Sequence, residues 1–134
     1  MALFRRCWAP AAVVAASYVA TKGFDLYDRI PWFDKAMHLL GGMALAYFIG
    51  GAGFRRRVCF LLTLAGALAW ELAEAMSDAR LGTAMTHGVA DTLRDLLFGC
   101  LGAAWFLTVD AYVTESRAAR SAAATGRSPR TEVR

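Results

Sequence analysis

Long apolar runs separated by short polar segments divide the chain into four candidate helices. The runs cover Cys7 to Phe24, about Ala36 to Phe54, Val58 to Met76 and Val89 to Val113. Each run approaches the ~20 residues that an α-helix needs to cross ~30 Å of hydrocarbon. No stretch alternates polar and apolar residues with a period of two, which argues against a transmembrane barrel. The pattern therefore predicts an all-α integral membrane four-helix bundle in residues 1–113.

The first run has two interpretations. Arg5 and Arg6, followed by a short stretch rich in Ala and Val, also have the form of a secretory signal peptide with a cleavage site near 15–17. We favour an uncleaved first span, because only then does the charge pattern of the whole chain agree.

Arginines lie in three clusters between or beside the apolar runs. They precede the first run at 5–6, join the second and third runs at 55–57, and follow the fourth run in 117–134. Basic flanks of membrane helices stay in the cytoplasm, and with four spans all three clusters fall on one side. We therefore predict a multi-pass protein of the bacterial inner membrane with both termini cytoplasmic. Residues 25–35 and 77–88 are then periplasmic connections.

The composition agrees with a lipid environment. Hydrophobic residues make up 57% of the chain and mean hydropathy is +0.38, more than a small soluble domain can usually bury. The net charge of +4 comes from the arginine flanks, so we expect membrane lipids and no nucleic acid as partners. Residues 114–134 are rich in Ala, Ser, Thr, Gly and Arg and predict a disordered basic cytoplasmic tail. Cys7, Cys59 and Cys100 lack metal-ligand spacing and predict reduced thiols.

Glycines concentrate in the second apolar run and recur in the next two. They are Gly41, Gly42, Gly50, Gly51, Gly53, Gly66, Gly99 and Gly102. Small residues let membrane helices approach closely, since packing replaces the hydrophobic drive that lipid removes. We interpret these glycines as a close helix interface.

Ionisable residues recur at one depth of the predicted spans. Counted at ~1.5 Å per residue from the nearest cytoplasmic arginine or helix end, they lie about 21–28 Å away, near the periplasmic face. The residues at this depth are Lys22, His38, Glu71, Glu74, Asp91 and Asp95. Ionisable groups inside a membrane are costly and therefore candidates for function. Helical spacing also puts Asp34 on the face of His38, and Asp91 on the face of Asp95.

The charges at this depth do not balance. Two cations, Lys22 and Arg94, stand against the four acids Glu71, Glu74, Asp91 and Asp95 when His38 is neutral. Such an imbalance in low dielectric requires protonated carboxyls, a bound divalent cation or contact with water.

One imidazole and four carboxylates suit Mg, Mn, Fe or Zn, and helix bundles bind metals with such residues on facing helices. The candidate metal ligands are His38, Glu71, Glu74, Asp91 and Asp95. The alternatives are structural pairing of the acids with Lys22 and Arg94, or a proton or ion relay. Trp70 either lines this site or faces lipid.

Three segments carry a resemblance to a known family. These are Tyr27-Asp28 to Asp34-Lys35-Ala36-Met37-His38 with Gly41-Gly42, Trp70-Glu71-Leu72-Ala73-Glu74, and Asp91-Thr92-Leu93-Arg94-Asp95 ahead of Gly99 and Gly102-Ala103. Together they resemble VanZ-like and YjdF-like small membrane proteins, which share an Asp-Lys-x-x-His element, an intramembrane Glu, and an Asp-x-x-x-Asp or Asn followed by Gly-Ala. The similarity covers about residues 27–103 and is closer to YjdF-like proteins, because VanZ-like proteins usually have Asn in place of Asp95. The resemblance implies the bundle and a polar constellation of Asp34, Lys35, His38, Glu71, Asp91 and Asp95, but no reaction.

These observations lead to three functional hypotheses. The first is a polar intramembrane pocket, open to the periplasm, that binds a divalent metal or a polar lipid or envelope group. The second is a non-catalytic accessory or assembly subunit, whose charges lock its helices to other membrane-protein subunits. The third is a metal-dependent lipid-headgroup hydrolase in which the metal activates water. Neither a Ser-His-Asp arrangement nor a phosphate-binding loop occurs, so the sequence names no substrate.

Overall fold

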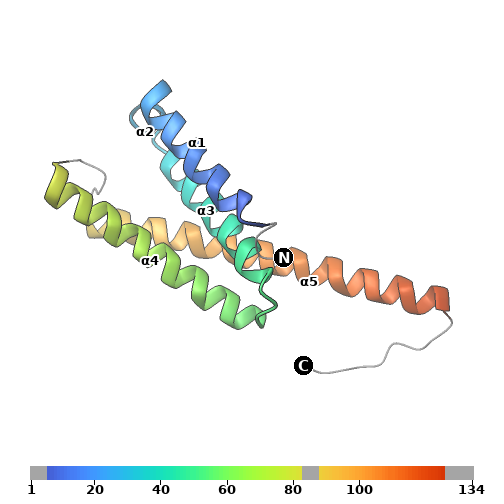
Figure 1. The fold of residues 1–134 in the computed structure, drawn as a ribbon. Helices are drawn as coiled ribbons and strands as arrows, with labels where there is room; N and C mark the ends of the chain where they lie inside the picture. Colours follow the sequence, from blue (N-terminus) through green and yellow to red (C-terminus); the bar gives the residue numbers. More distant parts are fainter. Residues whose placement is uncertain (1–5, 83–87, 126–134) are drawn as a thin grey trace.

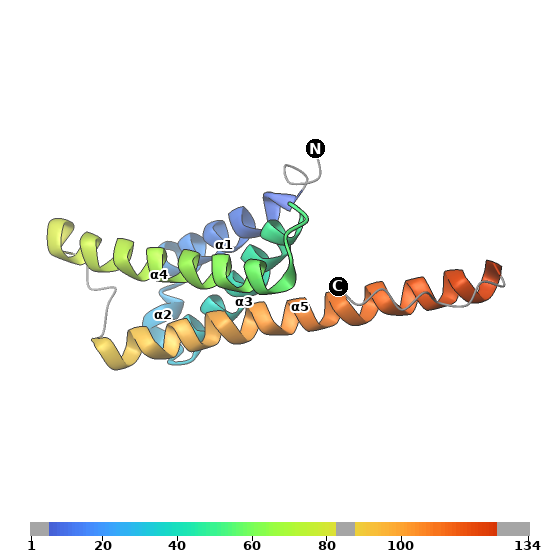
Figure 2. The ribbon, with the colours of Figure 1, turned by 90° about the horizontal axis from the view of Figure 1, so that it is seen from below.

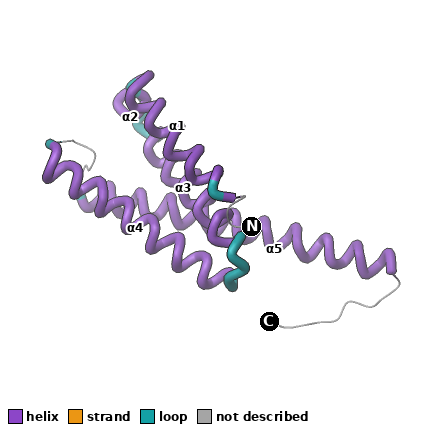
Figure 3. The backbone as a smooth tube through the Cα atoms, in the orientation of Figure 1, coloured by secondary structure: helices purple, strands orange, loops and turns teal. Residues whose placement is uncertain are grey.

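A computed structural model describes residues 6–82 and 88–125, without the side chains of Thr21, Lys22, Asp28 and Thr125. The regular structure in this part of the chain is helical throughout (Figure 3). It comprises α1 (Trp8–Phe24), the short α2 (Leu26–Arg29), α3 (Phe33–Gly50), α4 (Arg56–Leu81) and α5 (Val89–Thr125). Each of the four predicted apolar runs thus coincides with one long helix, and the all-α prediction is confirmed.

Helix α3 is the centre of the arrangement. It contacts α1, α4 and α5, while α4 also contacts α5. Figure 1 shows α1 following α3, and the pair crossing over α4 and α5. Helix α5 has 37 residues, and its C-terminal part extends well beyond the other helices (Figure 2). The ends of α1 and α4, the starts of α3 and α5, and α2 lie at one end of the bundle, away from the start of α1 and the C-terminal part of α5.

Glycines set the contact between α3 and α5. A methyl group added to Gly42 would collide with the backbone of Gly99, and one added to Gly102 would collide with the carbonyl of Leu39. In contrast, a methyl group on Gly41 would meet nothing. Close backbone approach of this kind requires glycine at the crossing point, so Gly42 and Gly102 belong to the predicted helix interface.

Small and polar side chains occupy the interior, and large apolar side chains cover the exterior. The buried residues of the described part are Ala9, Ala20, Met37, Gly42, Ala44, Ala46, Cys59, Thr63, Glu71, Asp95, Gly99, Gly102 and Ala103. Exposed residues include Leu61, Leu72, Leu101 and Trp105, each about half or more exposed. A soluble protein buries its large apolar side chains, whereas lipid accepts them on the surface. This distribution suits a protein surrounded by hydrocarbon.

Two of the described helices, α4 and α5, are long and apolar enough to cross a membrane. Their most apolar windows are only 17% buried, which separates them from the core helices of a soluble protein. Helix α1 contains a shorter apolar helical stretch, Trp8–Ala20. Helix α3 begins with Asp34 and Lys35, so its apolar part is short.

The structure differs from the sequence expectations at several boundaries. The connection at 25–35 contains α2, and α4 continues to Leu81, so the connection at 77–88 is shorter than expected; 83–87 lie outside the described residues. Helix α5 continues through Thr125 instead of giving way to a disordered tail at 114. The reason is composition, because alanine is the best helix former and this segment is rich in it. Residues 126–134 lie outside the described part.

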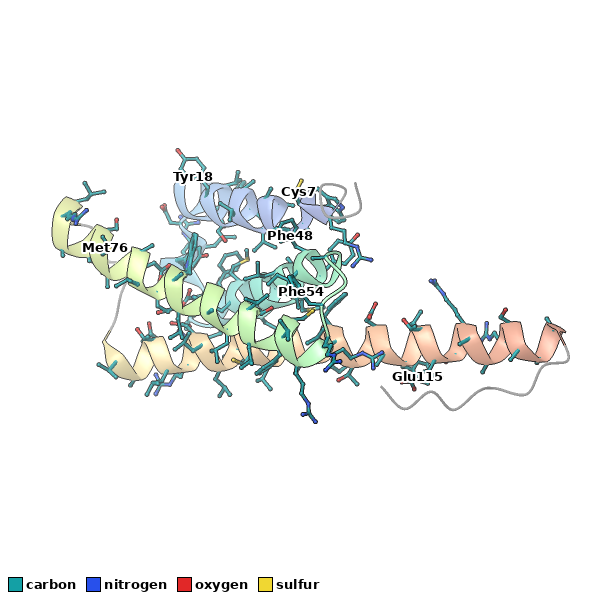
Figure 4. The ribbon with its side chains drawn as sticks, turned by 60° about the horizontal axis from the view of Figure 1, so that its bottom comes forward. Cys7, Tyr18, Phe48, Phe54, Met76 and Glu115 are labelled. Atoms are coloured by element: carbon teal, nitrogen blue, oxygen red, sulfur yellow. The ribbon has the colours of Figure 1, made fainter. Side chains whose placement is uncertain are left out.

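Basic residues gather at the end of the bundle where α3 finishes and α4 starts. The Arg6 guanidinium donates to the carbonyl of Tyr47 over 3.1 Å and lies over its ring, 4.6 Å from the centroid. Arg56 Nη1 lies 3.9 Å from Glu115 Oε1. Figure 4 shows Glu115 on the part of α5 that leaves the bundle. Two of the three arginine clusters therefore lie at one end, the arrangement that the charge pattern predicts.

Candidate functional site

At the end of the bundle opposite these arginines, Lys35 contacts three acidic side chains. Its ammonium nitrogen lies 2.6 Å from Asp91 Oδ1, 2.6 Å from Asp95 Oδ1 and 2.9 Å from Asp34 Oδ2. The contact with Asp95 is an ion pair by its distance, but it is not a hydrogen bond. Asp95 Oδ1 is buried and has no hydrogen-bond partner. One lysine of α3 thus holds two acids that are four residues apart on α5.

Asp34 and Lys35 precede the second predicted span, which begins near Ala36. Burial by itself favours the neutral form of Asp34, but hydrogen bonds from His38 and Lys35 outweigh it and lower the pKa of Asp34 to about 2. Burial likewise disfavours the charged form of Lys35, yet its contacts with three carboxylates raise its pKa. This ion pair is therefore charged throughout the physiological pH range.

His38 lies one helical turn after Asp34 and stands between the acids of α4 and α5. Its Nδ1 is 3.7 Å from Glu71 Oε1, while its Nε2 is 3.4 Å from Asp34 Oδ1 and 3.8 Å from Asp95 Oδ1. Glu71 is only 7% exposed, and its Oε1 has no hydrogen-bond partner. An unsatisfied carboxylate oxygen at this depth is costly and marks a place where a cation or a proton would be stabilised.

Glu74 completes the α4 side of the site. Its Oε1 accepts a hydrogen bond of 2.7 Å from Trp70 Nε1, one turn earlier on the same helix. In the described part of the chain, no lysine or arginine pairs with Glu71 or Glu74, because Lys35 is engaged by the acids of α3 and α5. Among the described side chains, five carboxyl groups therefore surround two groups that can carry a positive charge, Lys35 and His38.

Two groups of side chains are close enough to hold a metal ion. One comprises Asp34, His38 and Asp95, and the other His38, Glu71 and Glu74; within each group the ligand atoms lie within 4.8 Å of one another. Ligands at 2.0–2.4 Å from an ion are at most about 4–5 Å apart, so either group can close on one ion with small movements. The second group is the better candidate, since the Lys35 ammonium already contacts both acids of the first.

A cavity of about 240 Å³ adjoins the site. Asp34, His38 and Glu74 line it together with Trp70 and Tyr27. Its remaining walls come mainly from apolar and small residues of α1, α3 and α4. The polar cluster thus opens into a mostly apolar space between helices.

The structure brings together most of the residues that the sequence singled out, around the ammonium of Lys35. Depth counting predicts Lys22 and Arg94 as the cations that pair with the acids, and it places Lys35 in a connection. Arg94 is exposed and, among the described residues, pairs with no acid, because neighbouring residues of a helix face different directions and its neighbour Asp95 points inward. Lys22 belongs to α1, and its side chain is outside the described part.

Counting depth along the predicted spans does not identify two residues that line the cavity. Tyr27, from α2, lines the cavity, as does Ser17 of α1. The sequence pattern places neither residue in the site, and it gives no indication of the short helix α2 that carries Tyr27.

Asp91 and Asp95 lie on one face of α5, as their spacing predicts, and both reach the ammonium of Lys35.

Comparison with known sequences agrees with this fold. Residues 6–116 match a family described as "Predicted membrane protein (DUF2238)". The chain belongs to this family. The match includes all the candidate ligands and the whole described bundle up to the part of α5 that extends away. The closer resemblance to VanZ-like or YjdF-like proteins stays a prediction.

One relative is a protein of Thermotoga maritima that carries the name "Uncharacterized protein". It is 30% identical over 93 residues, which are 58% of this chain and 47% of the relative. The chain therefore spans about half the length of the curated relative that it matches. No solved structure matches the chain.

Proposed function

We propose that this member of the family binds a divalent cation within the membrane through His38, Glu71 and Glu74, near the periplasmic face. The observation that carries the proposal is the buried Glu71 Oε1, which has no hydrogen-bond partner and faces the imidazole of His38. A cation between the three side chains would satisfy this oxygen and offset the excess of carboxylates. One nitrogen and carboxylate oxygens suit Zn, Mn or Fe, and Mg with added waters.

The proposal places this site in a pocket that opens to the periplasm. It also assumes the membrane topology that the arginines predict. Both termini are cytoplasmic in the bacterial inner membrane, and α2 faces the periplasm. Asp34, Asp91 and Asp95 belong to a neighbouring ion pair with Lys35, which holds α3 and α5 in place beside the metal ligands.

Elemental analysis of the full chain, purified in mild detergent, tests the proposal. We expect about one divalent ion per chain in the wild type and loss of most of it in His38→Ala and Glu74→Gln. Asp110→Asn is the matched control, since it removes the same charge from an exposed position about 22 Å along α5 from Asp95. Metal content near zero in the wild type, with thermal stability unaffected by chelators, would contradict the proposal.

A second function has its own supporting observation. Lys35 contacts three acids on two helices, which is the arrangement expected if the charges are structural. In that case the protein is an accessory subunit of a larger membrane complex, and stoichiometric partner proteins co-purify with it. Lipid-headgroup hydrolysis would require the metal, and a metal-free protein excludes that activity as well.

A further inference from the structure

The cavity beside the acids is long and lies between two helices that touch each other little. Helices α1 and α4 each pack on α3, and few contacts join them directly in the described part of the chain. The cavity extends along α3 from Asp34 to Leu45 and along α4 from Thr63 to Glu74, about 16 Å in each case. A metal ion occupies a point, so the metal proposal leaves most of this space unexplained.

Polarity changes from one end of the cavity to the other. The end near α2 carries Asp34, Glu74, Tyr27 and Trp70. The opposite end is formed mainly by apolar side chains of α1 and α3, such as Val13 and Leu45, and by small residues. Gly41 lines the cavity, and a methyl group added there would meet nothing within 4 Å. Such a gradient fits a ligand with one polar and one apolar end.

The charges at the polar end of the cavity determine whether the head group of a ligand should be cationic or anionic. Among the described side chains, no lysine or arginine lines the cavity, and Lys35, which contacts Asp34, is engaged by three aspartates. A phosphate or carboxylate head would face Glu74, which pairs with no described lysine or arginine, and Asp34, whose partners Lys35 and His38 already contact other acids. A cationic head would find these acids together with two aromatic rings, which favour ammonium groups.

We infer that the cavity binds a single-chain amphiphile with an amino head, the head at Asp34 and Glu74 and the alkyl chain between α1 and α4. The inference does not need the metal proposed above, because it rests on the cavity, which extends beyond the metal group, and on the sign of the charges that line it. The two ligands share Glu74, so a bound divalent cation and the amphiphile compete.

Quenching of tryptophan fluorescence tests the inference with the full chain in zwitterionic nanodiscs and EDTA. One variant carries Trp8→Phe, Trp32→Phe and Trp105→Phe and keeps Trp70, which lines the cavity. The matched control keeps Trp105 instead, an exposed residue of α5 that reports contact with quencher dissolved in the bilayer. A bromoalkylamine should quench Trp70 at about tenfold lower concentration than Trp105, and a bromoalkanoate of equal length should show no such preference.

Filling the cavity should abolish the preferential quenching of Trp70 by the bromoalkylamine. Gly41→Leu puts a side chain into the open space, and Val14→Phe narrows the cavity from the half-exposed wall of α1. We expect at least one of them to fold with wild-type melting behaviour and to bring the quenching of Trp70 down to that of Trp105. Ethylamine, a head without a chain, should not displace the bromoalkylamine.

Three results would overturn the inference. Equal quenching of Trp70 and Trp105 would show that no cavity site exists. Equal or stronger quenching by the alkanoate would exclude the amino head, and full displacement by ethylamine would exclude the alkyl chain. Because EDTA is present throughout, these results are independent of whether the protein binds a metal.

Discussion

The ammonium of Lys35 lies 2.6 Å from Asp95 Oδ1 and joins the start of α3 to α5. The same nitrogen contacts Asp91, one turn earlier on α5. A single side chain therefore fixes both the rotation and the axial position of α5 relative to α3. The glycine crossing at Gly42 and Gly99 lies farther along the same pair of helices.

Loss of the lysine charge should destabilise the protein strongly. Lys35→Met leaves Asp34, Asp91 and Asp95 without their common cation in a largely buried place, and breaking a buried ion pair costs about 3–5 kcal/mol. We expect a loss at the lower end of this range, because the Lys35 side chain is 17% exposed. Thermal or denaturant unfolding in detergent measures it.

The charge-conserving control is Lys35→Arg, which should lose much less stability. Adding Asp91→Asn to Lys35→Met should recover part of the loss, because it removes one unpaired carboxylate. Unchanged melting of Lys35→Met would show that the ammonium does not hold α3 and α5 together.

Glu71 and Asp95 should be coupled energetically. Their buried oxygens lie 3.7 Å and 3.8 Å from the two nitrogens of His38, on different helices. Glu71→Leu and Asp95→Leu should each alter stability, and the double variant should differ from the sum by about 1 kcal/mol or more. A double-mutant cycle in unfolding free energy measures this coupling, and strict additivity would separate the two residues into independent sites.

The glycine crossing can be tested with two adjacent substitutions. Gly42→Ala forces a methyl group against the backbone of Gly99 and should cost about 1–3 kcal/mol of unfolding free energy. Gly41→Ala is the control, since its methyl group meets open space and alanine favours the helix. If both variants melt alike, the close approach of α3 and α5 is absent in the membrane.

The predicted topology can be measured by thiol labelling in intact cells. Cys7 is exposed beside the arginines of the N-terminus, so a membrane-impermeant maleimide in the periplasm should not reach it. A cysteine introduced as Arg29→Cys, at an exposed position of α2, should react once Cys7, Cys59 and Cys100 are replaced by serine. Periplasmic labelling of Cys7 would reverse the proposed orientation.

The positions of the long helices follow from the sequence alone. Apolar runs of about 18–25 residues, bounded by arginine or by Gly82 and Asp25 at left-handed helix ends, dictate where helices form, because backbone groups must be satisfied within each helix. The spacing of Asp91 and Asp95 likewise determines that both share a face. These are local properties, decided by residues within one or two turns.

Which faces meet is a property of the tertiary structure. Counting residues along separate helices gives the depth of each charge but not its direction, so it predicts Arg94 as a partner of the acids although this side chain is exposed beside the buried Asp95. Lys35 reaches the acids only because glycines let α3 and α5 approach closely. The long side chain of Lys35 then spans the remaining gap. The cavity also depends on packing, since its walls come mainly from α1, α3 and α4, and no single segment encodes the space that several helices leave between them.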